Sequence, residues 1–85
     1  MTRDEIRSTV LRILGGIAPE ADLGTLRGDS ALRETLDLDS MDFLNFVGAL
    51  HRVLAIDIPE RDYAKLATMK DALGYLAART AQARP

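Results

Sequence analysis

The sequence predicts an all-α fold, a bundle of four helices with a long loop between the first two and a short third helix. Three apolar segments repeat at the helical spacing of three and four residues, and loops separate them. Leucine and alanine dominate, aromatic residues make up 5% of the chain, and runs of β-branched residues are absent, which favours helices. We expect one domain over residues 1–85, with an ordered core at about residues 3–80.

The first predicted helix spans residues 3–16. Thr2 and Glu5 have the spacing of a capping box, in which each side chain binds the backbone N–H of the other residue. Pro19 prevents continuation of the helix. The apolar residues of this segment fall on one face, which we expect in the core: Ile6, Val10, Ile13, Leu14 and Ile17.

A long connection follows, over residues 18–38. A structureless loop of this length is uncommon in a compact domain. Five leucines supply anchors that can hold this loop against the bundle: Leu23, Leu26, Leu32, Leu36 and Leu38. Asp29 and Ser30 are expected to begin a short helical turn that extends through Arg33.

The longest apolar-rich segment without proline, residues 40–54, predicts the second helix. Asp39 is suited to cap this helix, so we expect Ser40 on its first turn. Backbone N–H groups lack helical partners there, and the helix dipole favours negative charge. A phosphate ester on the Ser40 hydroxyl would therefore lie at an anion site. Taken alone, an Asp-Ser pair at a helix start is usually only a cap.

An anchored loop and a short helix are expected next. Ile56 and Ile58 alternate like strand residues, but one short strand would have no partner, so both are expected to point inward from a loop. The short third helix is predicted at residues 61–66, where it presents Tyr63 or Leu66 to the core.

The final helix is predicted at residues 69–80. Thr68 is suited to cap it, and the tail, residues 80–85, is expected to be frayed. Its inner face is expected to consist of Met69, Leu73, Leu76 and Tyr75.

Composition and charge exclude several functions. A net charge of −2 and a pI near 5.2 argue against nucleic-acid binding, which needs a basic surface. No apolar segment approaches the roughly 20 residues that span a bilayer, and the first residues lack the form of a signal peptide. Without cysteine the fold depends on packing alone. We therefore expect a cytoplasmic protein, and we also expect a monomer.

Neither a metal site nor an active site is expected. His51 is the only histidine and there is no cysteine to assist it in binding a metal. His51 lies about 16 Å of axial rise from Ser40 along the helix, too far to act as its base, and we expect it to be exposed. A chain with one small core rarely builds a cleft that excludes water. We expect no catalytic residues and no enzyme.

An ordered set of residues spread over most of the chain carries a more specific signal: Asp29-Ser30, Leu32, Glu34, Leu36, Asp39-Ser40-Met41, Leu50, Ile58-Pro59 and Thr68. In this set the chain resembles the acyl carrier proteins, over roughly residues 3 to 78. The resemblance implies that Ser40 carries phosphopantetheine, which a separate phosphopantetheinyl transferase adds from coenzyme A. It implies that Asp39 caps the helix and serves recognition by the transferase.

The resemblance also implies a carrier of acyl groups, held as thioesters on the thiol of the arm. The partners would be acyl-loading, condensing or acyl-transferring enzymes of fatty-acid, lipid or polyketide-type synthesis. Related carriers shelter the acyl chain between helices, where burial of each CH₂ is worth about 0.8 kcal/mol. The matching positions are Val47, Leu50, Ile58, Tyr63 and Leu66. Tyr63 replaces the small residue that is common there.

The surface of the second helix departs from the family pattern. Related carriers of primary fatty-acid synthesis have several acidic residues on this helix, whereas Asp42 is the only one here. We expect Phe46 to be exposed, which suits a more apolar interface. The expected partner contacts are Met41, Asp42, Asn45, Phe46 and Arg52. These differences predict a specialised carrier for a dedicated pathway.

Two alternatives remain open. A peptidyl or aminoacyl carrier usually has a glycine-rich approach to the serine, whereas residues 36–39 read Leu-Asp-Leu-Asp. A helical adaptor without the prosthetic group would share the same fold.

Overall fold

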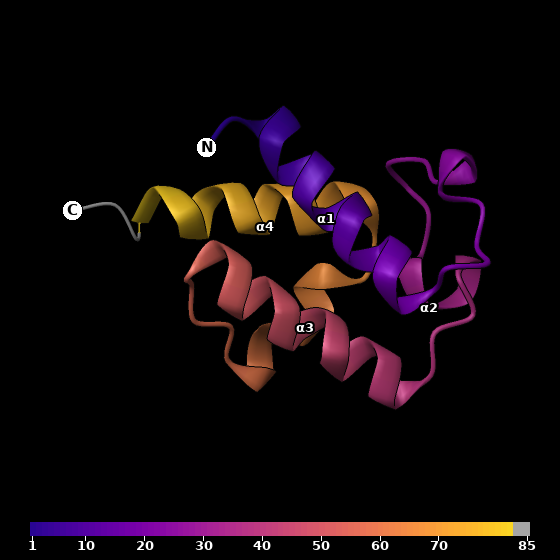
Figure 1. The fold of residues 1–85 in the computed structure, drawn as a ribbon. Coiled ribbons are helices and arrows are strands. Elements are labelled where there is room, and N and C mark those ends of the chain that lie inside the picture. Colours follow the sequence, from indigo (N-terminus) through magenta and orange to yellow (C-terminus); the bar gives the residue numbers. More distant parts are fainter. Residues whose placement is uncertain (83–85) are drawn as a thin grey trace.

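The computed structural model describes residues 1–82, which form helices joined by loops (Figure 1). Three long helices make up most of this part of the chain: α1 (Arg3–Ile17), α3 (Ser40–Leu54) and α4 (Met69–Gln82). The short elements are η1 (Leu23–Thr25), α2 (Leu32–Thr35) and η2 (Glu60–Leu66). The expected all-α bundle, with its long connection and short third helix, is confirmed. No helix within residues 1–82 has both the length and the apolar character needed to cross a membrane.

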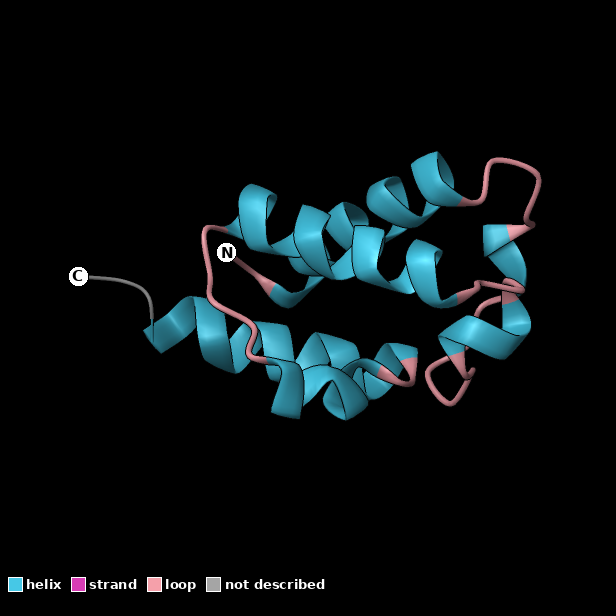
Figure 2. Ribbon diagram, turned by 90° about the horizontal axis from the view of Figure 1, so that it is seen from below, coloured by secondary structure: helices cyan, strands magenta, loops and turns pink. Residues whose placement is uncertain are grey.

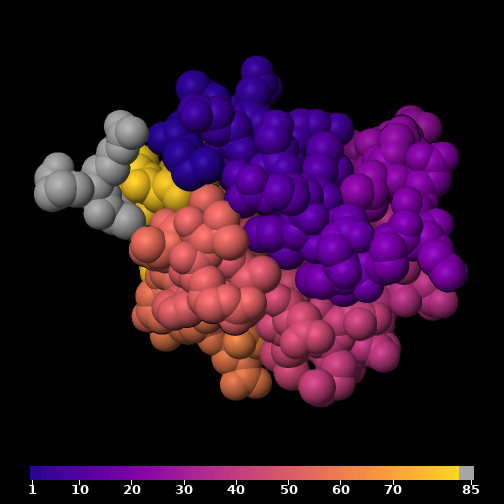
Figure 3. Space-filling view, viewed as in Figure 1, coloured from indigo at the N-terminus to yellow at the C-terminus, as the bar shows by residue number. Residues whose placement is uncertain are grey.

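The three long helices are joined through α1. α1 packs against both α3 and α4, and η2 packs against α4. The connection between α1 and α3 lies at one end of the bundle, and the start of α1 lies at the other (Figures 1 and 2). Because the connection ends at residue 39, it delivers the start of α3 to the loop end of the molecule (Figure 3).

The core draws on every long helix. Its largest fully buried side chains are Ile6, Val10, Leu14, Leu32, Phe46, Leu50, Leu66, Met69 and Leu76. The predicted inner face of α1 is confirmed, since its other two members, Ile13 and Ile17, pack partly buried against this core. The Thr2–Glu5 capping box is also present, with both of its hydrogen bonds.

The long connection is anchored by its leucines, as expected. Leu26, Leu32, Leu36 and Leu38 are buried, and Leu23 packs partly buried against the same core. Each of these leucines buries apolar side-chain area in the core, and this burial stabilises a long loop within a compact fold.

The expected start of the short helical turn is wrong. α2 begins at Leu32 rather than at Ser30, because the segment just before it is held extended against residues 67–69. The N–H of Leu32 donates to the carbonyl of Ala67 (2.9 Å), and that of Met69 donates to the carbonyl of Ser30 (3.2 Å).

The second half of the chain follows the prediction closely. Ile56 and Ile58 are buried in the loop after α3, Leu66 is buried, and Tyr63 is half-buried. α4 begins at Met69, with the Thr68 hydroxyl accepting the N–H of Asp71 (3.1 Å). The expectation of a frayed tail is wrong for residues 80–82, which continue α4, and residues 83–85 lie outside the described part of the chain.

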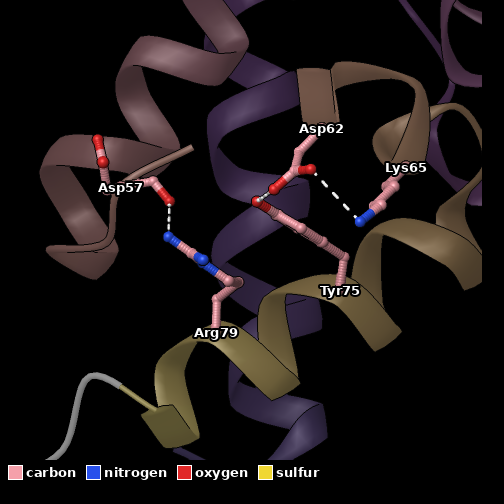
Figure 4. A network of polar contacts seen from close by, with 5 residues as sticks. All are labelled: Asp57, Asp62, Lys65, Tyr75 and Arg79. Carbon is pink, nitrogen blue, oxygen red and sulfur yellow. Dashed lines mark hydrogen bonds and ion pairs between the residues drawn. The ribbon is translucent and has the colours of Figure 1, made fainter. Parts of the chain in front are cut away.

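A polar network ties η2 to α4 (Figure 4). The Tyr75 hydroxyl donates to Asp62 Oδ2 (2.7 Å), and Lys65 Nζ lies 3.3 Å from Asp62 Oδ1. Arg79 donates to the carbonyl oxygen of Asp57. The Tyr75 hydroxyl, followed by Lys65, lowers the pKa of Asp62, whereas burial and the bond to Asp62 raise the pKa of Tyr75 to about 12.

Candidate functional site

A reciprocal cap fixes the start of α3. Asp39 is the N-cap residue, with extended backbone, and its Oδ1 accepts the N–H of Asp42 (2.7 Å). Asp42 Oδ2 accepts the N–H of Asp39 in return (3.3 Å). The cap expected of Asp39 is thus confirmed, and α3 begins at Ser40 as predicted.

The Ser40 hydroxyl is open to solvent on the first turn of α3. Ser40 is an exposed residue, and the one side chain within residues 1–82 that bonds its hydroxyl is Arg33, whose Nη2 lies 3.4 Å from Oγ. A bond of this length is weak. The hydroxyl is therefore accessible to another protein, at the helix end where the dipole favours a negative group.

The cap reduces the number of backbone N–H groups that the start of α3 can offer to an anion. The N–H of Asp42 is engaged by the Asp39 carboxylate and is not open to a phosphate. Two carboxylates, those of Asp39 and Asp42, also lie beside Ser40 in the cap. A phosphate ester on Ser40 would therefore meet both favourable and unfavourable charge.

A tight turn brings Arg33 next to Ser40. The N–H of Leu38 donates to the carbonyl of Arg33 (2.8 Å), and Asp37 between them has φ of 54°. This left-handed conformation is tolerated better by aspartate than by most residues. Because Leu36 and Leu38 on either side are buried, the turn is held against the core.

A half-open pocket of about 250 Å³ adjoins this turn. Its wall consists of Arg33, Glu34, Phe43, Tyr63, Ala64 and Ala67. The Arg33 guanidinium lies over the Phe43 ring, 5.5 Å from the centroid, and the Phe43 and Tyr63 rings meet edge to face at 6.1 Å. Arg33 belongs both to the pocket wall and to the Ser40 contact, so this one side chain connects the pocket with that hydroxyl.

The residues predicted for an acyl pocket are divided by the structure. Tyr63 lines the half-open pocket, whereas Val47, Leu50, Ile58 and Leu66 are buried in the core. The assignment of these four to a pocket stays a prediction.

Of the six residues in the pocket wall, sequence reasoning predicted Tyr63 and missed Arg33, Glu34, Phe43, Ala64 and Ala67. Phe43 carried the signal of an ordinary core position. Arg33 carried no signal, because its approach to Ser40 depends on the turn at Asp37 rather than on helical spacing.

The expectation of an exposed Phe46 is wrong. Phe46 is fully buried and its ring centroid lies 6.2 Å from that of Phe43. At about 100° per residue, Phe46 falls close to the arc of Phe43 and Leu50, which faces the core. Leu44, on the opposite flank of that arc, is 49% exposed instead.

The other residues predicted for partner contacts lie at the surface to different degrees. Met41 is 65% exposed, and Asn45 and Arg52 are exposed, whereas Asp42 is half-buried in the cap. His51 is exposed as expected, and its Nδ1 lies 2.5 Å from the carbonyl oxygen of Ile56, to which it donates when protonated there.

Comparisons with known proteins identify the family of the chain. The family model described as "Phosphopantetheine attachment site" matches residues 4–76. An acyl carrier protein of Campylobacter hominis is 34% identical over 73 residues, which are 86% of each chain. One from Campylobacter fetus subsp. fetus is 30% identical over 73 residues, 86% of this chain and 88% of its own. One from Helicobacter hepaticus is 33% identical over 57 residues, 67% of this chain and 75% of its own.

The prosthetic group fits the start of α3. An exposed serine hydroxyl with a cation beside it and a pocket next to that cation can accept a phosphodiester-linked arm. The comparisons confirm the expected covalent phosphopantetheine and a carrier rather than an enzyme. The chain belongs to the acyl carrier protein family.

Proposed function

We propose that Ser40 is the residue that receives phosphopantetheine, and that the chain passes acyl groups between the enzymes of a dedicated pathway. The observation that supports this most directly is the exposed Ser40 hydroxyl on the capped first turn of α3. When bound, the group supplies a thiol that holds the acyl chain as a thioester. The chain works as a single cytoplasmic domain and as a monomer.

Ser40 itself is chemically passive. Its hydroxyl is bonded by Arg33, which is a donor and cannot take a proton from it. A phosphopantetheinyl transferase therefore supplies the base that activates the hydroxyl. Asp39 serves this encounter by holding the first turn of α3 in one conformation through its bond to the N–H of Asp42.

The half-open pocket is suited to shelter the first part of an acyl chain. Phe43 and Tyr63 present aromatic surface in it, and Ala64 and Ala67 leave room. Each CH₂ that enters gains about 0.8 kcal/mol relative to water. Arg33 and Glu34 on the same wall favour a chain whose polar end stays outside.

The exposed face of α3 supports a specialised carrier. Met41 and Leu44 place apolar side chains on it, 65% and 49% exposed. The one acidic residue of α3, Asp42, is engaged in the cap. A partner that recognises α3 through basic residues would find few carboxylates here, whereas an apolar interface would be well matched.

Intact mass separates the carrier from a helical adaptor. After coexpression with a broad-range transferase, the chain is expected to gain the mass of one arm. No gain with any transferase would favour the adaptor. Loading by a peptide-synthesis adenylation enzyme, in preference to acyl-loading enzymes, would favour the peptidyl or aminoacyl carrier.

The specialisation is tested by transfer kinetics. The loaded protein is offered to housekeeping elongation enzymes beside their standard carrier, and a much lower kcat/KM is expected. The double variant Leu44→Asp, Asn45→Glu adds acidic residues to the exposed face and should raise this kcat/KM, whereas Arg12→Glu on α1 should not. Equal efficiency of the wild-type protein and the standard carrier would contradict the specialisation.

A further inference from the structure

We propose that Arg33 is a positioning residue that binds the phosphodiester of the arm and holds the arm at the mouth of the half-open pocket. This inference rests on the proposed attachment to Ser40. It concerns a side chain outside α3, which the chain brings to the serine through the turn at Asp37.

Arg33 is already placed for this role. Its Nη2 lies 3.4 Å from Ser40 Oγ, the atom that the phosphorus of the arm would be bonded to. A guanidinium at this distance from the ester oxygen is within reach of the phosphate oxygens, and its planar fork matches them. The Phe43 ring beneath the guanidinium, at 5.5 Å, holds it there through a cation–π contact.

The charge of Arg33 is available to an anion. Glu34, Asp37 and Asp39 are close to Arg33 in sequence, yet no carboxylate within residues 1–82 lies at ion-pair distance from it. By contrast, Arg27 is paired with Asp29 and Lys65 with Asp62. A guanidinium held by a ring and a neutral hydroxyl gains a full ionic partner when the phosphodiester arrives.

The start of α3 also requires a cation. In the cap, the N–H of Asp42 already donates to the Asp39 carboxylate. The carboxylates of Asp39 and Asp42 also lie beside Ser40. A phosphodiester adds a further negative charge to this turn, and like charges at short range repel. Arg33 is the cation that bonds the Ser40 hydroxyl, so it offsets this repulsion.

The pairing of Arg33 with the phosphodiester fixes the position of the first atoms of the arm. Because Arg33 is part of the pocket wall, a phosphodiester bound to it lies at the pocket mouth rather than free in solvent. The arm then starts beside Phe43, and less of its conformational freedom remains to be lost when its cargo enters the pocket.

The test uses ³¹P and arginine side-chain NMR of the holo protein. Wild type, Arg33→Gln, Arg33→Lys and the control Arg12→Gln are loaded with phosphopantetheine, and intact mass establishes one arm on each. The ³¹P resonance is recorded at low salt and at about 1 M salt, where the Debye length falls to about 3 Å. The Nε–Hε resonance of Arg33 is compared between the apo and holo proteins.

In the wild-type protein we expect the Arg33 Nε–Hε resonance to shift on loading and its hydrogen exchange to slow several-fold. The wild-type ³¹P resonance should move with salt toward that of Arg33→Gln, which itself should not move. Arg33→Lys should lie between them, and Arg12→Gln should match wild type.

Coincident ³¹P resonances of wild type and Arg33→Gln at both salt concentrations would overturn the inference, as would an equal change in Arg12→Gln. A wild-type chain that accepts no arm contradicts the proposed function itself, and with it this inference. A loaded chain without these effects contradicts only the role of Arg33.

Discussion

The chain contains the dipeptide Asp-Ser twice, ten residues apart, and the two copies have different surroundings. Ser30 is half-buried, and its hydroxyl accepts the N–H of Arg27 at 2.8 Å within a turn. Ser40 is exposed at the start of a 15-residue helix. One serine stabilises a turn, whereas the other offers its hydroxyl to solvent.

The difference comes from the segment on the C-terminal side of each dipeptide. After Ser30 the chain pairs with residues 67–69 in extended form, so its backbone and side chain are both engaged. After Ser40 the helix satisfies the backbone, and the cap is formed by Asp39 and Asp42 without the serine. A hydroxyl that the fold does not need is free for attachment of a prosthetic group.

The largest effect on the free energy of unfolding is expected from a substitution that removes packing between α3 and the core. Phe46→Ala should lower the free energy of unfolding by about 3–5 kcal/mol, because it empties a fully buried site between the helices. Leu44→Ala, on the exposed flank of α3, should change it by less than about 1 kcal/mol. Urea denaturation measures both, and similar losses would contradict the assignment of the two faces.

A smaller effect is expected from the two aspartates. Asp39→Ala should lower the free energy of unfolding by about 1 kcal/mol, because α3 loses its cap, and it should slow loading by the transferase. Asp29→Ala should cost less than about 0.5 kcal/mol, since its ion pair with Arg27 is exposed and 4.0 Å long. Denaturation and timed loading are compared for both variants. Equal losses in the free energy of unfolding would show that Asp39 and Asp29 contribute equally to stability.

The two serines should show the opposite order in stability. Ser30→Ala removes an acceptor of the Arg27 N–H and should cost about 0.5–1 kcal/mol. Ser40→Ala removes only a 3.4 Å contact and should leave the free energy of unfolding almost unchanged. A larger loss in apo Ser40→Ala than in Ser30→Ala would mean that the Ser40 hydroxyl has a structural role.

The smallest effect is expected at the network between η2 and α4, which neither dipeptide touches. The pKa of Asp62 is lowered below 3.8 when folded, so its contribution to stability is present above that pH and is lost as pH falls through the folded pKa. The pKa of Tyr75 is raised to about 12, so its contribution is present below about pH 10 and is lost as pH rises toward 12.

Tyr75→Phe tests this network through the pH dependence of unfolding. The difference in the free energy of unfolding between wild type and Tyr75→Phe should be largest between pH 3.8 and about pH 10. It should become smaller below and above this range. Lys70→Gln, on the exposed surface of α4, is the control and should follow wild type at every pH. Parallel curves for wild type and Tyr75→Phe would refute the proposed coupling of Asp62 and Tyr75.

Helical spacing and cap chemistry explain why most of the fold was predictable. The Thr2–Glu5 capping box, the leucine anchors of the connection and the start of α3 are local features of the sequence. The start of α2 was not predictable in this way, because residues 30–32 are held by backbone bonds to residues 67–69, which lie far along the chain.

The candidate site likewise contains residues that the local sequence predicts and residues that it does not. Ser40 and Asp39 were predictable because a cap and a first turn are local features. Arg33 was not, since a left-handed residue at Asp37 directs it to the serine. Phe46 and Leu44 flank the apolar arc of α3, and tertiary packing decides which of them is buried.

The attachment of one arm at Ser40 is tested most directly by timed transferase reactions on wild type, Ser40→Ala and Ser30→Ala, with intact mass as the readout. Wild type and Ser30→Ala should each gain a single phosphopantetheine at similar rates, and Ser40→Ala should gain none. Fragmentation of the loaded protein should place the added mass on residue 40. A gain of mass by Ser40→Ala, or its loss in a folded Ser30→Ala, would contradict the account.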